Sequence, residues 1–569
     1  MTSHPRIGRS EMKPLIDFGR SPRLAFLALA AAGLCLAADA RIARELANAT
    51  GDAQVDVIVQ YAQEPSDHDR DRLSRVGGAL KWDLHSIHAE AVRVPAGAIA
   101  TLASDPNVVY VSPDRPVRAM LDLSAAAVNA AAARSFDLDG TGIGVAVVDS
   151  GIAAHPDLGK RVVYSTSVLG GSATDGYGHG THVAGIVGGS GKDSTGQIFT
   201  RTFKGIAPNV NLIDIRVLGS NGQGTDSSVI AGIEQAIQLK NRYNIRVINL
   251  SLGRPVFESY TVDPLCQAVE AAWNAGIVVV VAAGNDGRDD SMGTNGYGTI
   301  TAPGNDPYVI TVGAMKTNGT PQRGDDTIAS YSSKGPTVID HVVKPDLVAP
   351  GNQVCSLLDN GSYLDTTYPQ NIVPFTYYTD TSIGLPTPMY YTLSGTSMAT
   401  PVVSGAAALL IQQNPRLTPD QVKARLMKSA YKAFPASSTV IDPTTGIAYT
   451  DQYDIFTVGA GYLDIAAALN NNDTGRGLAL SPTVAQAGNS GSYQLVFASG
   501  TIWGSGSPWA LAVVWGTSVL QNASTNVNSD AVVWGTSNVQ GLAVIWGTAV
   551  IWGSSPTSAL NDGVLISGE

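Results

Sequence analysis

A serine stands among small residues in the segment Gly395-Thr396-Ser397-Met398-Ala399-Thr400-Pro401. The next residues, 402–410, are mostly apolar and predict a tightly packed helix that begins near this serine. A serine at a helix N-terminus lies beside unpaired backbone N–H groups and the positive end of the helix dipole. Such surroundings suit a nucleophile whose attack on a carbonyl creates an oxyanion. For this segment alone, a serine that merely caps the helix is the alternative.

Two upstream segments carry side chains that could assist such a serine. Residues 143–148 are a continuous apolar run, which predicts a strand buried on both faces, and Asp149-Ser150-Gly151 follows it. Residues 175–185 form a glycine-rich turn that leads into a helix and contains His182. A serine hydroxyl is a weak nucleophile and needs a base. A histidine that a carboxylate orients can supply this base.

Together these three segments resemble the subtilisin-like serine proteases, whose catalytic residues occur in the order Asp, His, Ser. The α/β-hydrolases share the chemistry but have the order Ser, Asp or Glu, His, and they require Gly-x-Ser-x-Gly, where this chain has Ala399 in the last position. The resemblance covers roughly residues 50–470. It implies an α/β fold, with a three-layer αβα core around a mostly parallel sheet, and the hydrolysis of peptide bonds in protein or peptide substrates.

The resemblance also implies a role for each residue of the site. Ser397 would attack the peptide carbonyl, His182 would accept its proton, and Asp149 would orient and stabilise the imidazole. Asn285 matches the asparagine that donates to the oxyanion together with the backbone N–H of the nucleophile. The structural alternatives are a core histidine, a capping aspartate and an asparagine in a turn. No cofactor is required for this chemistry.

Two further segments, residues 222–224 and 251–253, match the two substrate-flanking edges of the family. Their backbones would pair with an extended peptide, and their glycines would allow it to approach closely. Simple turn glycines are the alternative. We expect a roomy apolar P1 pocket, with Thr301 at its base changing its size. The residues expected at the two edges are Gly222, Gln223, Gly224, Ser251, Leu252 and Gly253. The two walls of the pocket would be Ser251-Leu252-Gly253 and the segment of Ala282, Ala283 and Gly284.

Composition limits the kind of protein this is. The 569 residues can hold several domains, and the net charge of −11 argues against a surface for nucleic acid or anionic membranes. No Cys/His cluster has zinc-ligand spacing. Of the three cysteines, Cys35 falls in a segment expected to be removed, and Cys266 and Cys355 are either free buried thiols or a disulfide.

The chain divides into four expected segments. Residues 1–40 resemble a secretory signal, with an apolar run over 24–37 and the cleavage site Ala38-Asp39-Ala40, an uncleaved anchor being the alternative. Residues 41–121 have a βαββαβ pattern, which predicts a ferredoxin-like α+β sandwich. Their position resembles that of the family's inhibitory propeptide, which implies a zymogen that processes itself. A separate ligand-binding domain is the alternative.

Residues 122–475 would be the catalytic domain. Apolar strands alternate with amphipathic helices, which predicts a parallel sheet with helices on both faces. Ligands then bind at the carboxyl ends of the strands, and Asp149 and Asn285 each follow a strand end. The mature enzyme would be secreted, without a membrane span after removal of the signal, and the propeptide would be its intramolecular inhibitor.

Two parts of this domain depart from the family pattern. A long insertion between Gly351 and Gly395 is rich in tyrosine, and it either shapes the cleft or is a surface loop. Residues 189–204 do not match the family's common calcium loop, and only Asp157 matches a ligand position. The sequence therefore does not decide whether the chain binds a structural calcium ion. The tyrosines of the insertion are Tyr363, Tyr368, Tyr377, Tyr378, Tyr390 and Tyr391.

The tail, residues 476–569, has a different composition. It has no Lys or Arg after Arg476, and it repeats an apolar residue, Trp, Gly and then Ser or Thr at irregular spacing. Short β hairpins or a disordered segment both fit this pattern. The sequence leaves four alternatives for the tail, namely cell-surface attachment, polymer binding, a removable appendage for secretion and a plain structural extension. The repeats begin at Ile502, Val514, Val533, Ile545 and Ile551.

Overall fold

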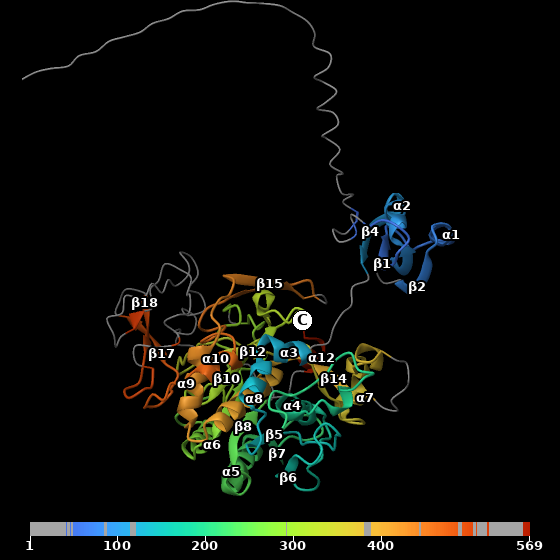
Figure 1. Ribbon diagram of the computed structural model, residues 1–569. Helices are drawn as coiled ribbons and strands as arrows, with labels where there is room; N and C mark the ends of the chain where they lie inside the picture. Colours follow the sequence, from blue (N-terminus) through green and yellow to red (C-terminus); the bar gives the residue numbers. More distant parts are fainter. Residues whose placement is uncertain are drawn as a thin grey trace, which may run out of the picture. The chain divides into compact units, whose positions relative to one another are not determined.

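The structure is a computed structural model, and it divides into two compact units, residues 1–117 and 118–569 (Figure 1). The segment 1–40 and four of the five Trp-Gly repeats lie outside the residues that it describes. The described residues are 41–42, 46, 49–84, 88–113, 121–291, 293–380, 388–442, 445–487, 492–503, 508, 521–522 and 562–568.

The first unit is a four-stranded antiparallel sheet with two helices. The strand order is β2-β3-β1-β4, and the elements follow one another in the predicted βαββαβ order. Alternate residues of β1, such as Val57 and Val59, pack against Leu73 of α1 and Ile99 of α2 in a separate core. The elements are β1 (Gln54–Tyr61), α1 (Asp67–Arg75), β2 (Ala79–Leu84), β3 (Ala89–Pro95), α2 (Ile99–Ala103) and β4 (Val108–Pro113).

The second unit contains an eight-stranded sheet with the order β11-β10-β9-β8-β5-β7-β6, and β12 also pairs with β10. The pairings are parallel except that of β10 with β11, so the predicted mostly parallel sheet is confirmed. The strands are β5 (Gly144–Asp149), β6 (Val162–Ser167), β7 (Asn211–Arg216), β8 (Ile245–Leu250), β9 (Val278–Ala282), β10 (Ile310–Lys316), β11 (Thr327–Ile328) and β12 (Leu347–Pro350).

Helices cover both faces of this sheet, which confirms the three-layer core. The pair α4 and α8 packs on one face, and the pair α5 and α6 packs on the other (Figure 1). The helices around the sheet are α3 (Leu121–Ala127), α4 (His179–Gly188), α5 (Asp226–Tyr243), α6 (Pro264–Asn274), α8 (Thr396–Gln413), α9 (Pro419–Ser429) and α10 (Ile465–Asn470).

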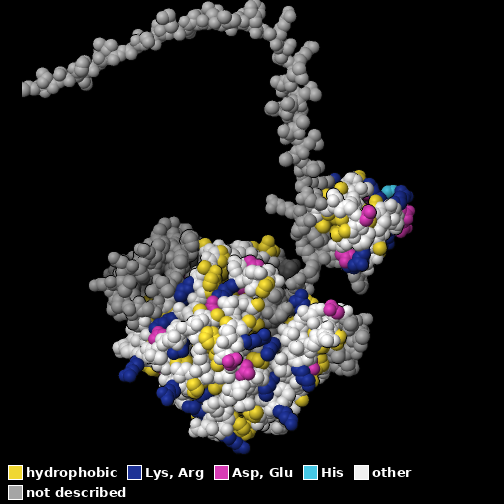
Figure 2. Space-filling model, in the orientation of Figure 1, with side chains coloured by type: hydrophobic (Ala, Val, Ile, Leu, Met, Phe, Trp, Pro, Cys, Tyr) yellow, Lys and Arg dark blue, Asp and Glu magenta, His cyan; other side chains and the backbone are white. Residues whose placement is uncertain are grey.

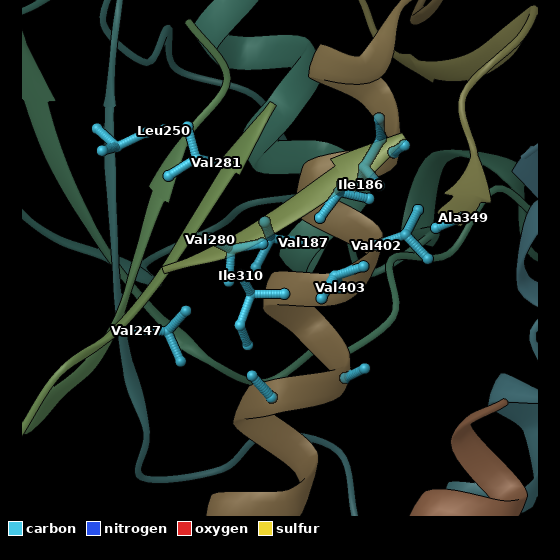
Figure 3. Packing of buried hydrophobic residues seen from close by; sticks show 14 of the residues in the cluster. Ile186, Val187, Val247, Leu250, Val280, Val281, Ile310, Ala349, Val402 and Val403 are labelled. Atoms are coloured by element: carbon cyan, nitrogen blue, oxygen red, sulfur yellow. The ribbon is translucent and has the colours of Figure 1, made fainter. Parts of the chain in front are cut away.

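The core explains why the central strands are apolar along their whole length. Every residue of β5 and β9 is buried, because helices cover the sheet from both sides. Figure 3 shows Val403 of α8 facing Val280 and Ile310 of the sheet, and Val402 beside Ala349. The small residues of α8 allow this close packing. A Cβ added at Gly405 would lie 2.6 Å from the Cβ of Ile206.

One buried carboxyl in this sheet should make stability depend on pH. Asp214 of β7 is 1% exposed, and burial raises its pKa to about 8. An unfolded aspartate has a pKa near 4, so folding takes up a proton between about pH 4 and pH 8, and stability falls as pH rises through this window. Between pH 4 and pH 8, this carboxyl should lower the free energy of unfolding by an amount on the order of a few kcal/mol. We expect Asp214→Asn, made together with Ser397→Ala to prevent self-digestion, to abolish this decrease. Urea unfolding at pH 4 and pH 8 measures the free energy of unfolding of the Ser397→Ala protein with and without Asp214→Asn. If the two proteins differ by the same free energy at both pH values, the prediction is contradicted.

The tyrosine-rich insertion is folded into the second unit. It contains an antiparallel pair, β13 (Val354–Leu357) and β14 (Tyr390–Leu393), and the short helix α7 (Tyr363–Thr367). The ring of Tyr390 lies edge-on to Phe203, with centroids 4.7 Å apart, and Tyr378 accepts a backbone hydrogen bond from Thr200 at 2.9 Å. The insertion therefore packs against the segment 189–204 and helps to fix its position. This contact is separate from any role of the insertion in shaping the cleft.

The described part of the tail also packs on the second unit. β17 (Thr483–Ala487) and β18 (Ser492–Val496) form a hairpin, β19 (Gln521–Asn522) pairs with β18, and α12 (Asp562–Ser567) ends the chain. Trp503 of the first repeat is 2% exposed, and its indole N–H donates to Leu480 O at 2.7 Å. This first repeat therefore has a structural role in the unit.

Both cysteines of the second unit are buried free thiols, which settles the alternatives for Cys266 and Cys355. In the face of the unit that Figure 2 shows, Lys and Arg side chains are scattered and do not gather in one patch. Among the described residues, no helix has the length and apolar character needed to cross a membrane.

Candidate active site

The centre of the site is a buried pair of Asp149 and His179. Asp149 ends β5 and His179 begins α4, so a strand end and a helix start place the two side chains together. His179 Nδ1 donates to Asp149 Oδ1 at 2.7 Å, and both side chains are fully buried. The backbone N–H of Ser150 donates to the same oxygen at 2.8 Å. A carboxylate can only accept, so Nδ1 carries a proton, and in the neutral imidazole Nε2 then has the free lone pair.

The turn before α4 sets the position of His179. Gly178 has a φ of +103°, a conformation that favours glycine. A Cβ added there would also lie 2.5 Å from Ser362 Oγ. His179 Nε2 is buried and makes no hydrogen bond to a described residue. It is therefore available to exchange a proton.

The structure contradicts the predicted pairing of His182 with Asp149. His182 lies one helical turn further into α4, and its Nε2 is 3.1 Å from both Val354 O and Tyr391 O, so it donates to the paired strands of the insertion. Burial, together with the charge of His179, lowers the pKa of His182 to about 3. This ring stays neutral and holds α4 against the insertion.

One signal in the sequence could have separated the two histidines. They lie at positions i and i+3 of one helix, so their spacing alone does not tell which one faces the strand end. Side chains at the start of a helix lie nearest the carboxyl edge of a parallel sheet. The same rule that selects Asp149 therefore favours His179 over His182.

Ser397 is held against the end of β8. Its Oγ donates to Ser251 O at 3.0 Å, while Ser251 Oγ donates to Ser397 O at 2.7 Å. Asn249 of β8 donates to Ser251 Oγ at 2.9 Å and accepts from Ser404 of α8 at 2.8 Å. This chain of hydrogen bonds fixes the start of α8 to one of the two predicted substrate edges.

Asn285 and the backbone of Ser397 converge on one point. Asn285 Oδ1 accepts from the backbone N–H of Thr396 at 2.9 Å and from its hydroxyl at 3.1 Å, so the amide Nδ2 faces the other way. A Cβ added at Gly395 would lie 3.2 Å from Asn285 Nδ2 and 3.7 Å from Ser397 N. Both amide atoms of Asn285, with Oδ1 at 3.6 Å, and the backbone N–H of Ser397 therefore line the space that glycine leaves open. Gly395 has a φ of +135°.

The insertion reaches the predicted edge at residues 222–224. Tyr363 stacks on Tyr177, with centroids 5.7 Å apart, and the ring of Tyr177 lies 2.7 Å from the place where a Cβ of Gly222 would be. Glycine at 222 is thus required by packing. Its exposed neighbour Gln223 accepts from the N–H of Gly219 at 2.8 Å, which closes a tight turn.

Thr301 lies between the two walls predicted for the P1 pocket. A Cβ at Gly253 would be 2.5 Å from Thr301 Oγ1, and a Cβ at Gly284 would be 2.8 Å from Thr301 Cγ2. The backbone N–H of Thr301 donates to Ala283 O at 3.0 Å. Its side chain therefore fills space between the walls. The other wall residues, Leu252 and Ala282, are also buried.

The surroundings of Asp157 do not fit a calcium ion. Calcium takes six to eight oxygen ligands, whereas the candidate set here is one imidazole and two carboxylates, His155, Asp157 and Asp193. Asp157 Oδ1 already accepts from Asp193 N at 2.9 Å, and Oδ2 accepts from the Tyr390 hydroxyl at 2.8 Å. His155 Nδ1 accepts from the N–H of Asp157, and its Nε2 donates to Met389 O. Hydrogen bonds from Asp193 and from Tyr390 of the insertion therefore already engage both carboxylate oxygens of Asp157.

Comparison with known proteins identifies the family of the region that carries these residues. The profile of the Subtilase family (Peptidase_S8) matches residues 140–462, more than half of the chain. The matched region includes Asp149, His179, Asn285 and Ser397.

Individual relatives cover much of the same region. The chain is 41% identical over 365 residues to the serine protease AprX of Bacillus subtilis (strain 168), which is 62% of this chain and 76% of that protein. It is 37% identical over 355 residues to the extracellular serine proteinase of Thermus sp. (strain Rt41A), which is 60% of this chain and 70% of that protein. A solved structure of a cold adapted subtilisin-like serine proteinase is 32% identical, covers 52% of this chain and 85% of that chain, and has a TM-score of 0.38. This chain belongs to the subtilase family and is a serine endopeptidase that acts on protein substrates.

Proposed function

We propose that Asp149, His179 and Ser397 form the catalytic triad of a secreted endopeptidase that is made as a zymogen. The buried 2.7 Å hydrogen bond between Asp149 and His179 is the observation that carries the proposal. In the neutral imidazole it leaves Nε2 as the free base, at the edge of the sheet where the Ser397 loop begins. The hydrogen bond with Ser251 keeps Ser397 at the same edge.

In the reaction, the Ser397 hydroxyl turns from Ser251 O toward His179 Nε2 and attacks the peptide carbonyl. Nε2 takes the hydroxyl proton, and Asp149 stabilises the imidazolium without itself taking the proton. The new oxyanion lies between Asn285 Nδ2 and the N–H of Ser397. When the C–N bond breaks, Nε2 returns the proton to the leaving amine, and water then hydrolyses the acyl-serine by the same route.

The substrate would lie between the edges at residues 222–224 and 251–253, which would pair with its backbone. We expect Thr301 to limit the size of the P1 side chain, because it fills space between Gly253 and Gly284. Thr301 would therefore reduce the size of an otherwise apolar pocket.

Thr301→Gly should enlarge this pocket. We expect kcat/KM for a substrate with phenylalanine at P1 to rise about tenfold relative to one with alanine, because each added methylene in an apolar pocket is worth roughly 10- to 200-fold in discrimination. The ratio of kcat/KM for two matched peptide anilides measures the change. Thr301→Ser is the control, since it removes only a methyl group. A ratio unchanged in Thr301→Gly would contradict the assignment of Thr301 to the pocket.

The first unit would be the inhibitory propeptide and residues 1–40 the secretory signal. The boundary between the two compact units falls between residues 117 and 118, next to the segment 118–133 in which we expect the scissile bond. The Thermus relative is named an extracellular proteinase, which supports secretion. The Trp-Gly repeats of the tail would then be the segment that retains the secreted enzyme at the cell surface.

Self-processing can be tested by the intact mass of the purified chain over time, beside Ser397→Ala. We expect only the wild type to lose the first unit, because the Ser397→Ala protein lacks the nucleophile. The masses also locate the mature ends. Equal processing of the two proteins would show that another protease makes the cut, which contradicts self-maturation.

A further inference from the structure

The end of the chain returns to the loop that carries the nucleophile. The backbone N–H of Ser394, three residues before Ser397, donates to Leu565 O at 2.8 Å. Leu565 belongs to α12 and is 2% exposed, and it packs in the core of the second unit. In Figure 1, α12 is drawn beside β14, the strand that leads to Ser394.

Side chains of the catalytic domain also hold this segment. Asn371 Nδ2 donates to Ile566 O at 2.8 Å and to Thr392 O at 2.8 Å, so one amide joins α12 to β14. Gly568 lies so close to the loop that a Cβ there would be 2.3 Å from Ser394 Oγ and 2.5 Å from Asn352 Oδ1. The contact therefore runs along residues 565–568 and involves both backbone and side-chain groups.

The contact with residues 565–568 lies on the nucleophile loop itself, so its position bears on how a peptide substrate binds. The acyl side of a peptide would lie toward Ser251 and the pocket around Thr301, as argued above. A peptide that crosses Ser397 must continue past the scissile bond along the other flank of the nucleophile loop. Ser394 is part of that loop, and its N–H, which could donate to a substrate carbonyl, is bound to Leu565 O.

We propose that residues 562–568 occupy the part of the cleft that receives the leaving-group side of a peptide substrate. The segment then acts as an intramolecular competitor of long substrates, and Ser394 and Asn371 are the groups that bind either the segment or the substrate. This inference rests on the proposed function of Ser397. It gives the far end of the tail a role separate from that of its Trp-Gly repeats.

Two substrates separate this inference from the catalytic proposal. A peptide p-nitroanilide has no amino acid after the scissile bond, whereas an internally quenched peptide with four residues after it extends along the nucleophile loop. For the chain that lacks residues 562–569, we expect kcat/KM for the quenched peptide to rise about tenfold and that for the anilide to stay within twofold. Equal changes for the two substrates, or none, would overturn the competitor role. If the full chain does not hydrolyse the anilide at all, that result would instead count against the catalytic proposal.

Variants of the full chain give an independent test. Leu565→Asp places a charge in an apolar core and should release the segment, reproducing the effect of the deletion. Leu565→Met keeps the volume and apolar character and should behave as the wild type. A synthetic peptide of residues 560–569 should inhibit the shortened enzyme on the quenched peptide but not on the anilide, and a scrambled peptide should inhibit neither. If Leu565→Asp only lowers the melting temperature and leaves the ratio of the two substrates unchanged, α12 is a structural anchor and the inference fails.

Discussion

Replacing His179 by alanine should lower kcat/KM by about 10⁴-fold or more, because it removes the group that takes the proton from Ser397 and returns it to the leaving amine. The substitution also removes the hydrogen bond from His179 to Asp149 Oδ1 and leaves that from the backbone N–H of Ser150. Rates with a peptide anilide, measured for protein whose folding is checked by circular dichroism, give this value. Binding of the substrate should change far less than kcat.

His182 provides the matched control on the same helix. His182→Gln keeps a donor for the carbonyls of Val354 and Tyr391, so we expect some loss of stability but less than a tenfold change in kcat/KM of the folded protein. The opposite pattern, with activity kept in His179→Ala and abolished in His182→Gln, would restore the assignment first made from the sequence.

Asn285→Ala should lower kcat by about 10²- to 10³-fold with little change in KM, since the lost hydrogen bond forms mainly in the transition state. The amide Nδ2 is aimed at the open side of Gly395, while Oδ1 is already occupied by Thr396. Initial rates over a range of anilide concentrations separate kcat from KM.

A second substitution tests the same space without removing either donor. Gly395→Ala would place a methyl group 3.2 Å from Asn285 Nδ2, where the oxyanion is to form, and at a φ that disfavours alanine. We expect a loss of kcat similar to that of Asn285→Ala, and little further loss when the two are combined. A rise in KM with unchanged kcat in both variants would show that this space binds the ground state and not the oxyanion.

The strands and the residues that follow them were predictable from the sequence. Asp149 and Asn285 come after runs that are apolar throughout, and such runs form the centre of a parallel sheet, whose carboxyl edge binds ligands. Ser397 was predictable from the small residues that let α8 pack closely. The βαββαβ order of the first unit was predictable because each segment has its own period and its own turn signals.

Helical spacing alone does not decide between the two histidines, because it brings both to similar sides of α4, whereas the position of His179 at the start of the helix favours it. The neutral, buried state of His182 depends on carbonyls of an insertion far along the chain, at Val354 and Tyr391. The hydrogen bond from Tyr390 to Asp157 and the return of α12 to Ser394 are likewise long-range contacts. No local pattern of residues determines such contacts.

The most direct test of the account is covalent labelling of the active site with a fluorophosphonate, followed by mass mapping of the labelled peptide. The account predicts one phosphonyl group per mature enzyme, on Ser397, with loss of activity in proportion to labelling. It also predicts that labelling is abolished in Ser397→Ala and slowed by orders of magnitude in His179→Ala, but not in His182→Gln. A label on another residue of the active enzyme, or full activity in enzyme labelled at Ser397, would contradict the claim that Ser397 is the nucleophile that Asp149 and His179 activate.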